Sequence, residues 1–549
     1  MRARRIVIAA VAVAIFAAAF LYRFNALGGA LGGFDNDHFL YYLRAKQVAH
    51  GERPLRDFSD AGLQGAWPAL TYEVPALAQR LGGETLLSEA VLCIVLIAVA
   101  LVLTFLSAAQ WAGIPTALAV TLVSLFFGAK LYGYSKLLIF AGACALFFCY
   151  ARRPDTRRIA LLALWSAVAF LFRHDFLVYL VAPVAVLAGV MAWPDWRQLL
   201  RQALVYGGLV TVLLAGPLYS VQHFVGIRTY VEESAAMSRR EAERTHIPTP
   251  SFKATPGGAR DFLTDEDNAA AFVYFVAWAI PLLALAGIPF AREVGGLTRR
   301  QVRAVVAATA ILALALDYSF LRGNLSARFG DLGAPVAVLA AWVFTARSRS
   351  GGGRVATAAA AVVCLASVLI SADALGSVTR ELDTTGLSDS VGKVERRFIA
   401  AAGELRALPA SVPLDEQGRR DVVAYLRECT RPDDRVLVLA STPEIATFAN
   451  RAFAAGEPTF TPGFYTSEAD QRRMLQRLAR QSVPVVVTEA EGVYQEDLAP
   501  EFPLVDEYVR TFYEPVGELP GLRERPMRVL VRRQRVGHPW DATGWPCFS

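Results

Sequence analysis

The sequence is poor in charge, in lysine and in cysteine, and each shortage excludes a class of protein. Only 19% of the 549 residues are charged and the mean hydropathy is +0.37, which excludes a single soluble domain. Six cysteines are too few for a disulfide scaffold. Only five of the 55 basic residues are lysines, and most basic residues stand in short gaps between apolar runs. This spacing is typical of membrane topology, so we expect no nucleic-acid partner.

Motifs for nucleotides and metals are also missing. The C-terminal region contains neither G-x-G-x-x-G nor a P-loop, so no nucleotide site is predicted there. No internal repeat stands out, and no His/Cys/Asp/Glu cluster has metal-ligand spacing. Asp35 and Asp37 together could hold a divalent cation, but two carboxylates alone make a weak site.

The sequence is rich in apolar runs, and these predict a polytopic α-helical membrane protein. Eleven segments are long enough for spans, some of them only marginally: 6–22, 86–109, 114–131, 135–150, 158–172, 175–192, 203–222, 269–290, 303–321, 328–346 and 355–372. The first segment follows Arg2, Arg4 and Arg5 and also fits a signal peptide. We favour a retained anchor, because removing it would spoil the parity of the spans that follow.

The loops between these segments predict the orientation. With a cytoplasmic N-terminus, every arginine-dense short loop lies inside, as the positive-inside rule requires. These loops carry Arg152, Arg153, Arg157 and Arg158, then Arg197 and Arg201, then Arg292, Arg299, Arg300 and Arg303, then Arg347, Arg349 and Arg354. Eleven spans then place everything after about residue 373 outside.

Two domains follow from this topology. A transmembrane domain covers 1–373, including a long first outer loop at 23–85, and an extracytoplasmic α/β domain covers 374–549. The tail predicts helices near 388–407, 416–428 and 467–481 and strands at 435–440, 483–488 and 527–532.

Cysteine placement separates the two domains. Cys429 and Cys547 both lie in the outer tail, where a disulfide and two free thiols are about equally expected. The other four cysteines lie within predicted spans and fit small apolar packing residues.

The first outer loop carries the strongest functional signal. Asp35 and Asn36 are good N-caps and Gly51 is a good helix stop, so we expect a helix over 37–49. Asp37, Tyr41 and Arg44 share one face of it by i, i+4, i+7 spacing. Taken alone, the two aspartates are slightly better explained as helix caps, whose negative charge complements the helix dipole, than as catalytic groups.

A second polar block follows in the same loop, from Leu55 through Arg56, Asp57 and Asp60. Each of these residues, taken singly, would ordinarily be a solvated loop residue.

These two blocks together resemble the GT-C superfamily of membrane glycosyltransferases, which includes protein O-mannosyltransferases, aminoarabinose transferases and actinobacterial arabinosyl- and mannosyltransferases. The resemblance covers roughly residues 1–345 and implies a catalytic aspartate in the first outer loop. The usual acidic pair is here Asp35-Asn36-Asp37. Aligning on Asp-x-x-His-Phe favours Asp35, whereas aligning on the downstream helix and His50-Gly51 favours Asp37. We lean to Asp37 and keep Asp35 as the alternative.

The resemblance also implies a polyprenyl-phosphate sugar as donor. A carboxylate must accept the proton of the attacking hydroxyl, and cations must stabilise the departing lipid phosphate. Candidate substrate-binding residues on the outer side are Arg56, Asp57, Lys136, Arg173, His174, Arg322 and Arg328. For each cation the structural alternative is an interfacial side chain that reaches the lipid head groups.

Two outer turns contribute most of these cations. The turn Phe172-Arg-His-Asp-Phe176 is the better supported phosphate site, because Arg173 and His174 lie in an outer turn, where this chain is otherwise poor in basic residues. Asp175 in the same turn would pair with Arg173. In the turn 320–331, an Arg328–Asp331 pair is about as well supported as a phosphate site. The charged loop 223–268 fits a mobile gate or a solvated helix, and we assign it no chemistry.

We therefore expect an inverting glycosyltransferase that moves a sugar from a polyprenyl-phosphate donor to a cell-envelope glycan, lipid or protein. It would lie in the bilayer of a bacterial inner (plasma) membrane. The alternatives are a transporter or flippase of a lipid-linked sugar and a non-catalytic envelope scaffold. The transporter ranks lower, because the spans are almost purely apolar at mid-membrane and no half of the chain repeats the other.

Overall fold

The structure is a computed structural model in which the chain forms two compact units. It describes residues 2–27, 34–59, 68–127, 130–245, 248–318, 329–331, 333–346, 351–376, 378–410, 421–489, 494–521, 526–533 and 537–549. Unit 1 comprises Met1–Ala26, Cys93–Ser220 and Glu241–Phe398, and unit 2 comprises Leu27–Leu92, Val221–Arg240 and Ile399–Ser549.

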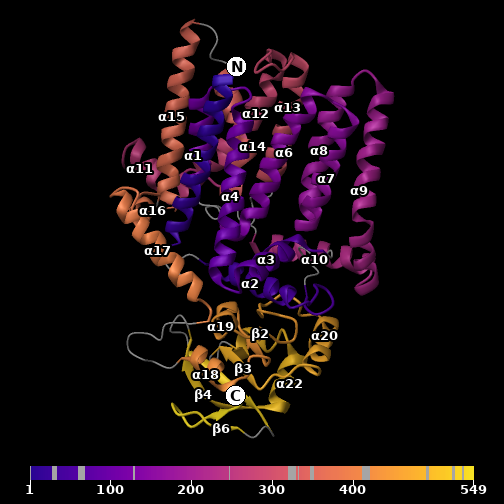
Figure 1. The fold of residues 1–549 in the computed structure, drawn as a ribbon, viewed down its shortest axis with the longest axis vertical. Helices are drawn as coiled ribbons and strands as arrows, with labels where there is room; N and C mark the ends of the chain where they lie inside the picture. Colours follow the sequence, from indigo (N-terminus) through magenta and orange to yellow (C-terminus); the bar gives the residue numbers. More distant parts are fainter. Residues whose placement is uncertain are drawn as a thin grey trace. The chain divides into compact units, whose positions relative to one another are not determined.

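Unit 1 is a bundle of long apolar helices (Figure 1). Each of the eleven predicted spans falls on one helix: α1 (Arg2–Ala26), α4 (Leu86–Ala108), α5 (Ile114–Phe126), α6 (Tyr134–Arg152), α7 (Thr156–Phe172), α8 (His174–Ala192), α9 (Trp196–Phe224), α12 (Glu266–Gly287), α13 (Arg299–Tyr318), α14 (Gly333–Ala346) and α15 (Gly351–Gly376). Within the described residues, eight helices are long and apolar enough to cross a membrane, and α5 and α14 are shorter apolar helices. The prediction of a polytopic helical membrane protein is therefore confirmed.

Helix α13 lies at the centre of unit 1, where it contacts α6, α8, α12 and α14. Its buried face is rich in alanine, including Ala304, Ala308 and Ala313, none of which is exposed. Small side chains let helix backbones approach closely, which is how helices gain packing energy where lipid surrounds them. Shorter helices in unit 1 are α11 (Ala259–Thr264) and α16 (Val378–Thr385), and α17 (Val391–Ala407) begins there and continues into unit 2 after Phe398.

Unit 2 contains the tail, which is built on a mixed sheet of order β2-β1-β3-β5-β4. The strands are β1 (Arg435–Leu439), β2 (Ala452–Phe453), β3 (Val485–Glu489), β4 (Tyr513–Pro520) and β5 (Pro526–Arg532). β2 and β3 run parallel to β1, while β5 is antiparallel to both β3 and β4. A short hairpin of β6 (His538–Pro539) and β7 (Pro546–Cys547) lies near the C-terminus.

The helices of unit 2 come from three parts of the chain. The tail supplies α18 (Val422–Cys429), α19 (Pro443–Ala449), α20 (Glu468–Leu478), a π-helical turn η4 (Tyr494–Leu498) and α22 (Pro503–Phe512). The first outer loop supplies α2 (Asn36–Ala49) and α3 (Leu70–Gly82), and α10 (Ile227–Thr245) begins in this unit. The first outer loop from Leu27 and the tail from Ile399 thus share one compact unit, while the division into 1–373 and 374–549 stays a prediction.

The expected tail elements are present, with additions. β1, β3 and β5 match the three predicted strands, and α17, α18 and α20 match the predicted helices. The outer segment 223–268, which fitted a solvated helix as well as a gate, contains α10. Strand β4 and helix α3 were not predicted from the sequence. β4 contains two prolines, Pro515 and Pro520, and among the described strands it is paired on one side only, by β5.

A disulfide joins Cys429 at the end of α18 to Cys547 on β7, 118 positions later. The sequence left this bond open, and the structure forms it. Cys93 and Cys144 form no disulfide and are buried, as expected of packing residues.

Candidate functional site

The two candidate bases stand at the N-terminus of α2 in different environments. Asp35 is the N-cap, and its Oδ1 accepts a hydrogen bond of 2.9 Å from the backbone N–H of His38. Asp37 lies in the first turn of the helix, and its side chain is exposed. The cap that the sequence predicted is therefore made by Asp35, whereas Asp37 faces solvent.

The predicted shared face of α2 is confirmed by its contacts with one tyrosine. The ring of Tyr41 lies 6.1 Å from the ring of Tyr72 on α3. Arg44 Nη1 donates a hydrogen bond of 3.3 Å to the Tyr72 hydroxyl. Tyr72 is fully buried and therefore supports α2 along the side from which Asp37 projects.

The His-Gly motif ends α2. Gly51 has φ of +90°, a conformation that favours glycine, and His50 Nε2 lies 2.6 Å from Glu84 Oε1. Lys46 Nζ lies 3.1 Å from the other oxygen of Glu84. These contacts give the motif a structural role in closing the helix.

His38 is a polar residue that the sequence did not single out. It is 1% exposed, and neither ring nitrogen has a hydrogen-bond partner among the described residues. Its ring packs edge-on against the ring of Phe34, and the two ring centroids are 4.4 Å apart. Burial lowers the pKa of His38 to about 4, so the imidazole is neutral at physiological pH.

Arg56 and Asp57 belong to a local turn of the same unit. Arg56 Nε donates to both Asp57 carboxylate oxygens, at 2.9 and 2.8 Å, and Asp57 Oδ2 also accepts the N–H of Arg53 at 2.8 Å. The hydrogen bond to Asp57 raises the pKa of Arg56, whose side chain is 43% exposed. Asp57 thus closes the turn, and Arg56 remains accessible. Asp60 lies outside the described residues.

Unit 1 contains the other described candidates. Lys136, in the first turn of α6, forms an ion pair with Asp331, and both side chains are mostly buried. Arg173 Nη2 lies 2.8 Å from Asp175 Oδ2, and the guanidinium stacks over the ring of Phe176. Lys136 is also among the cations that act on the Asp175 carboxylate. The structure therefore brings Lys136 and Arg173 into one group of alternating charges.

His174 begins α8, next to this group. Arg322 and Arg328 lie outside the described residues, and with them the expected Arg328–Asp331 pair. Asp331 pairs with Lys136, a contact that the sequence did not predict because the two residues are far apart in the chain.

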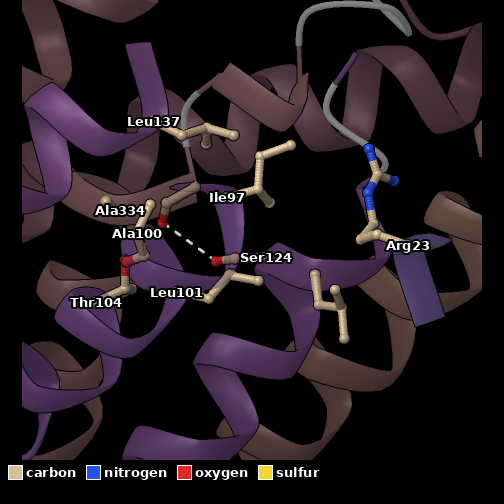
Figure 2. Close-up of a pocket in the computed structure, with 10 residues that line it drawn as sticks. Arg23, Ile97, Ala100, Leu101, Thr104, Ser124, Leu137 and Ala334 are labelled. Atoms are coloured by element: carbon tan, nitrogen blue, oxygen red, sulfur yellow. Dashed lines mark hydrogen bonds between the residues drawn. The ribbon is translucent and has the colours of Figure 1, made fainter. Parts of the chain in front are cut away.

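A small pocket in unit 1 adds a charged residue that the sequence analysis missed. Arg23, near the end of α1, lines it together with apolar side chains and two hydroxyls, and the cavity volume is about 20 Å³ (Figure 2). Both hydroxyls are bonded to backbone: Ser124 donates to Gly333 O at 3.2 Å and Thr104 to Ala100 O at 2.8 Å. The signal that could have identified this site is an arginine directly after the first predicted span, in the last turn of α1.

A second, apolar pocket in the same unit also includes Ser124 and Gly333 in its lining. It lies between α5, α12, α14 and α15, has a cavity volume of about 90 Å³ and is bordered by valine, alanine, phenylalanine and isoleucine side chains. Such a lining suits a hydrocarbon chain.

Within the described residues, no group of three or more His, Cys, Asp or Glu side chains could hold a metal ion. Asp35 and Asp37 are the pair that the sequence offered for a divalent cation, and one oxygen of Asp35 is already used as the helix cap.

Comparison with known proteins finds similarity in three dimensions only. No protein-family model matches the chain, and no curated protein does. Among solved structures, the chain is similar to ArnT from Cupriavidus metallidurans bound to undecaprenyl phosphate, with a TM-score of 0.51 and 12% identity over 99% of each chain. It also matches the apo state of ArnT, with a TM-score of 0.48 and 12% identity over 96% of this chain and 98% of ArnT. The oligosaccharyltransferase of Archaeoglobus fulgidus matches with a TM-score of 0.44 and 13% identity, over 92% of this chain and 73% of that one. The likeness to ArnT extends over the whole chain and concerns the fold, which agrees with the fold that the resemblance in the sequence predicted.

Proposed function

We propose that the chain is an inverting glycosyltransferase that uses a polyprenyl-phosphate sugar and an extracytoplasmic cell-envelope acceptor. The observation that carries the proposal is an exposed carboxylate, Asp37, in the first turn of α2, within a chain whose fold matches a transferase solved with undecaprenyl phosphate along its whole length. The apolar pocket of unit 1 supports a lipid-linked donor, because a polyprenyl chain needs such a lining.

Asp37 acts as the general base in this proposal. Its carboxylate accepts the proton of an acceptor hydroxyl while the hydroxyl oxygen forms a bond to the anomeric carbon of the donor. The bond from that carbon to the phosphate oxygen breaks on the opposite face of the sugar, so one displacement inverts the configuration. Asp35 is the alternative base, but its oxygen already accepts from His38 N–H, and this favours Asp37.

The leaving polyprenyl phosphate requires cations, and arginine matches phosphate through its planar fork. We assign this role to Arg173, together with Arg56, Lys136 or Arg328. Arg173 and Lys136 each carry a carboxylate partner, Asp175 and Asp331, so lipid phosphate would displace or share these partners on binding. Asp57, His174 and Arg322 stay candidate substrate-binding residues.

The proposed location is a bacterial inner membrane, with the N-terminus cytoplasmic and unit 2 extracytoplasmic. The disulfide between Cys429 and Cys547 supports an oxidising compartment for the tail. A divalent cation at Asp35 and Asp37 belongs to the same proposal, and chelation of the purified enzyme tests it.

The experiment uses purified protein in detergent, a panel of polyprenyl-phosphate sugars, and crude envelope extract as the acceptor. Mass spectrometry follows release of polyprenyl phosphate by the wild type, D35N and D37N. We expect release that collapses in D37N. Equal release by all three proteins would show that neither aspartate is the base.

A further inference from the structure

Helix α2 is held along the tail sheet at both of its ends, entirely within unit 2. At its start, Asn36 Nδ2 donates a hydrogen bond of 3.0 Å to the carbonyl of Ser441, just past the carboxyl end of β1. Just beyond its other end, Glu52 forms an ion pair with Arg435, the first residue of β1. The helix therefore runs opposite to β1, and its N-terminus lies where that strand ends.

Between these ends, a buried ion pair joins the helix to the segment after β2. Arg44 Nη2 lies 4.0 Å from Glu457 Oε2, and the side chains are 7% and 2% exposed. The same guanidinium donates to the hydroxyl of Tyr72. Arg44 is thus fixed between α3 on one side and the tail on the other.

The backbone that carries Glu457 is itself fixed. Ala455 and Gly456 have φ of +60° and +81°, and the Gly456 carbonyl accepts the N–H of Ser59 at 3.1 Å. A Cβ at Gly456 would lie 2.3 Å from the guanidinium of Arg477, so only glycine fits there. Arg477 in turn donates to the Ser59 hydroxyl at 2.9 Å. Glu457 therefore stands on a turn with little freedom to follow a moving helix.

We propose that Glu457 and Arg44 are positioning residues that set the rotation of α2 about its axis and thereby aim the carboxylate of Asp37 at its substrate. Arg44 and Asp37 are seven residues apart on one face of the helix, so a rotation of one moves the other. This inference rests on the proposed role of Asp37 as base. In this proposal the tail orients the helix that carries the base, in addition to any contact that it makes with the acceptor.

The charge state of Glu457 makes its ion pair with Arg44 depend on pH. The groups that face it are Arg44 on α2, Ser59 in the outer loop, and Arg477 and Asp470 on α20, with the Tyr72 hydroxyl beyond Arg44. Burial raises the pKa of Glu457 to about 7, with Arg44 acting in the opposite direction. The pair is therefore charged on both sides above about pH 7 and loses the carboxylate charge below it.

The test compares E457Q, R44M and the double variant in the full-length protein, with E518Q as the matched control. Glu518 pairs with Arg528 on the exposed side of the β4–β5 hairpin in the same unit, so E518Q removes an ion pair that does not contact α2. Hydrogen exchange at pH 8 measures the amides of α2, while the amides of β1 and β3 report that the tail remains folded.

We expect exchange within α2 to accelerate about tenfold in E457Q and in R44M, with no further acceleration in the double variant, because the two residues act as one unit. E518Q should match the wild type. Exchange in α2 that is the same in E457Q and E518Q, with β1 and β3 protected in both, would overturn the proposal.

The kinetic arm measures release of polyprenyl phosphate between pH 6 and 8.5. We expect E457Q to lower kcat about tenfold with the donor KM unchanged, and to lose the decline in rate that the wild type shows below pH 7. An unchanged kcat, or a wild-type pH profile in E457Q, would overturn the positioning role. If the wild type releases no polyprenyl phosphate from any donor, the proposed function fails, while the exchange arm still decides whether Glu457 holds α2.

Discussion

Lys136 and Asp331 form an ion pair across 195 positions of the chain, and both side chains lie mostly buried in unit 1. Lys136 stands in the first turn of α6, and Asp331 stands just before α14. The pair ties the beginnings of two helices together and gives the proposed phosphate-binding lysine a fixed place. A phosphate that binds Lys136 must compete with the Asp331 carboxylate for the ammonium group.

The stability of unit 1 tests this pair. K136M leaves the Asp331 carboxylate partly buried without its cation, so we expect a loss of about 1–2 kcal/mol in the free energy of unfolding. The double variant K136M/D331N should be more stable than K136M alone, since no charge is left uncompensated. Thermal unfolding in one detergent measures both; equal stability of K136M and the wild type would show that the pair contributes nothing.

The two aspartates of α2 should respond differently to substitution. D37N should lower kcat for release of polyprenyl phosphate by about 10²–10⁴-fold, the usual contribution of a general base. D35N should keep most activity and stability, because asparagine is an equally good N-cap. D35A should cost about 1 kcal/mol of stability. Rates and thermal unfolding of the three variants separate the roles, and a larger kinetic loss in D35N than in D37N would reverse our assignment.

The disulfide should stabilise the tail. Cys429 and Cys547 are 118 positions apart in the sequence, and bridging a loop of that length contributes about 5 kcal/mol in the chain-entropy model. We expect C429S/C547S, or a reducing agent, to lower the unfolding temperature of unit 2. C93S is the control, since Cys93 is a buried cysteine that forms no disulfide. Thiol labelling of the unfolded protein checks the bond directly, and four labelled thiols are expected without reductant and six with it.

The buried His38 predicts a loss of stability in acid. Its pKa is lowered to about 4 by burial, so the unfolded chain binds the proton more readily between pH 4 and 6.5. The free energy of unfolding therefore falls as the pH drops through this window, by an amount on the order of 3 kcal/mol. H38F keeps the packing against Phe34 and removes the titrating group, so its loss over the same window should be smaller. Parallel curves for the wild type and H38F would show that His38 is not held neutral.

Much of the architecture was predictable from the sequence because local patterns determine it. Apolar runs of about 20 residues predicted the helices of unit 1, and Asp35 and Gly51 predicted the ends of α2. Short β-branched runs predicted β1, β3 and β5. Strand β4 escaped prediction because its sequence, Tyr513–Pro520, has two prolines and little β-branching, and it exists through its pairing with β5.

The sequence by itself determined the apolar spans, the cap of α2 and the presence of carboxylates and cations in the outer segments. These features depend on neighbouring residues and on the hydrophobic effect, which act before any long-range contact forms. Only the tertiary structure decided that Asp37 is exposed, that Lys136 pairs with Asp331, and that Arg44 meets Glu457. Each of these features joins residues that are distant in the sequence or depends on which side chains become buried. An isolated charge pattern cannot specify them, because many partners of opposite charge are available to every arginine and lysine until packing excludes all but one.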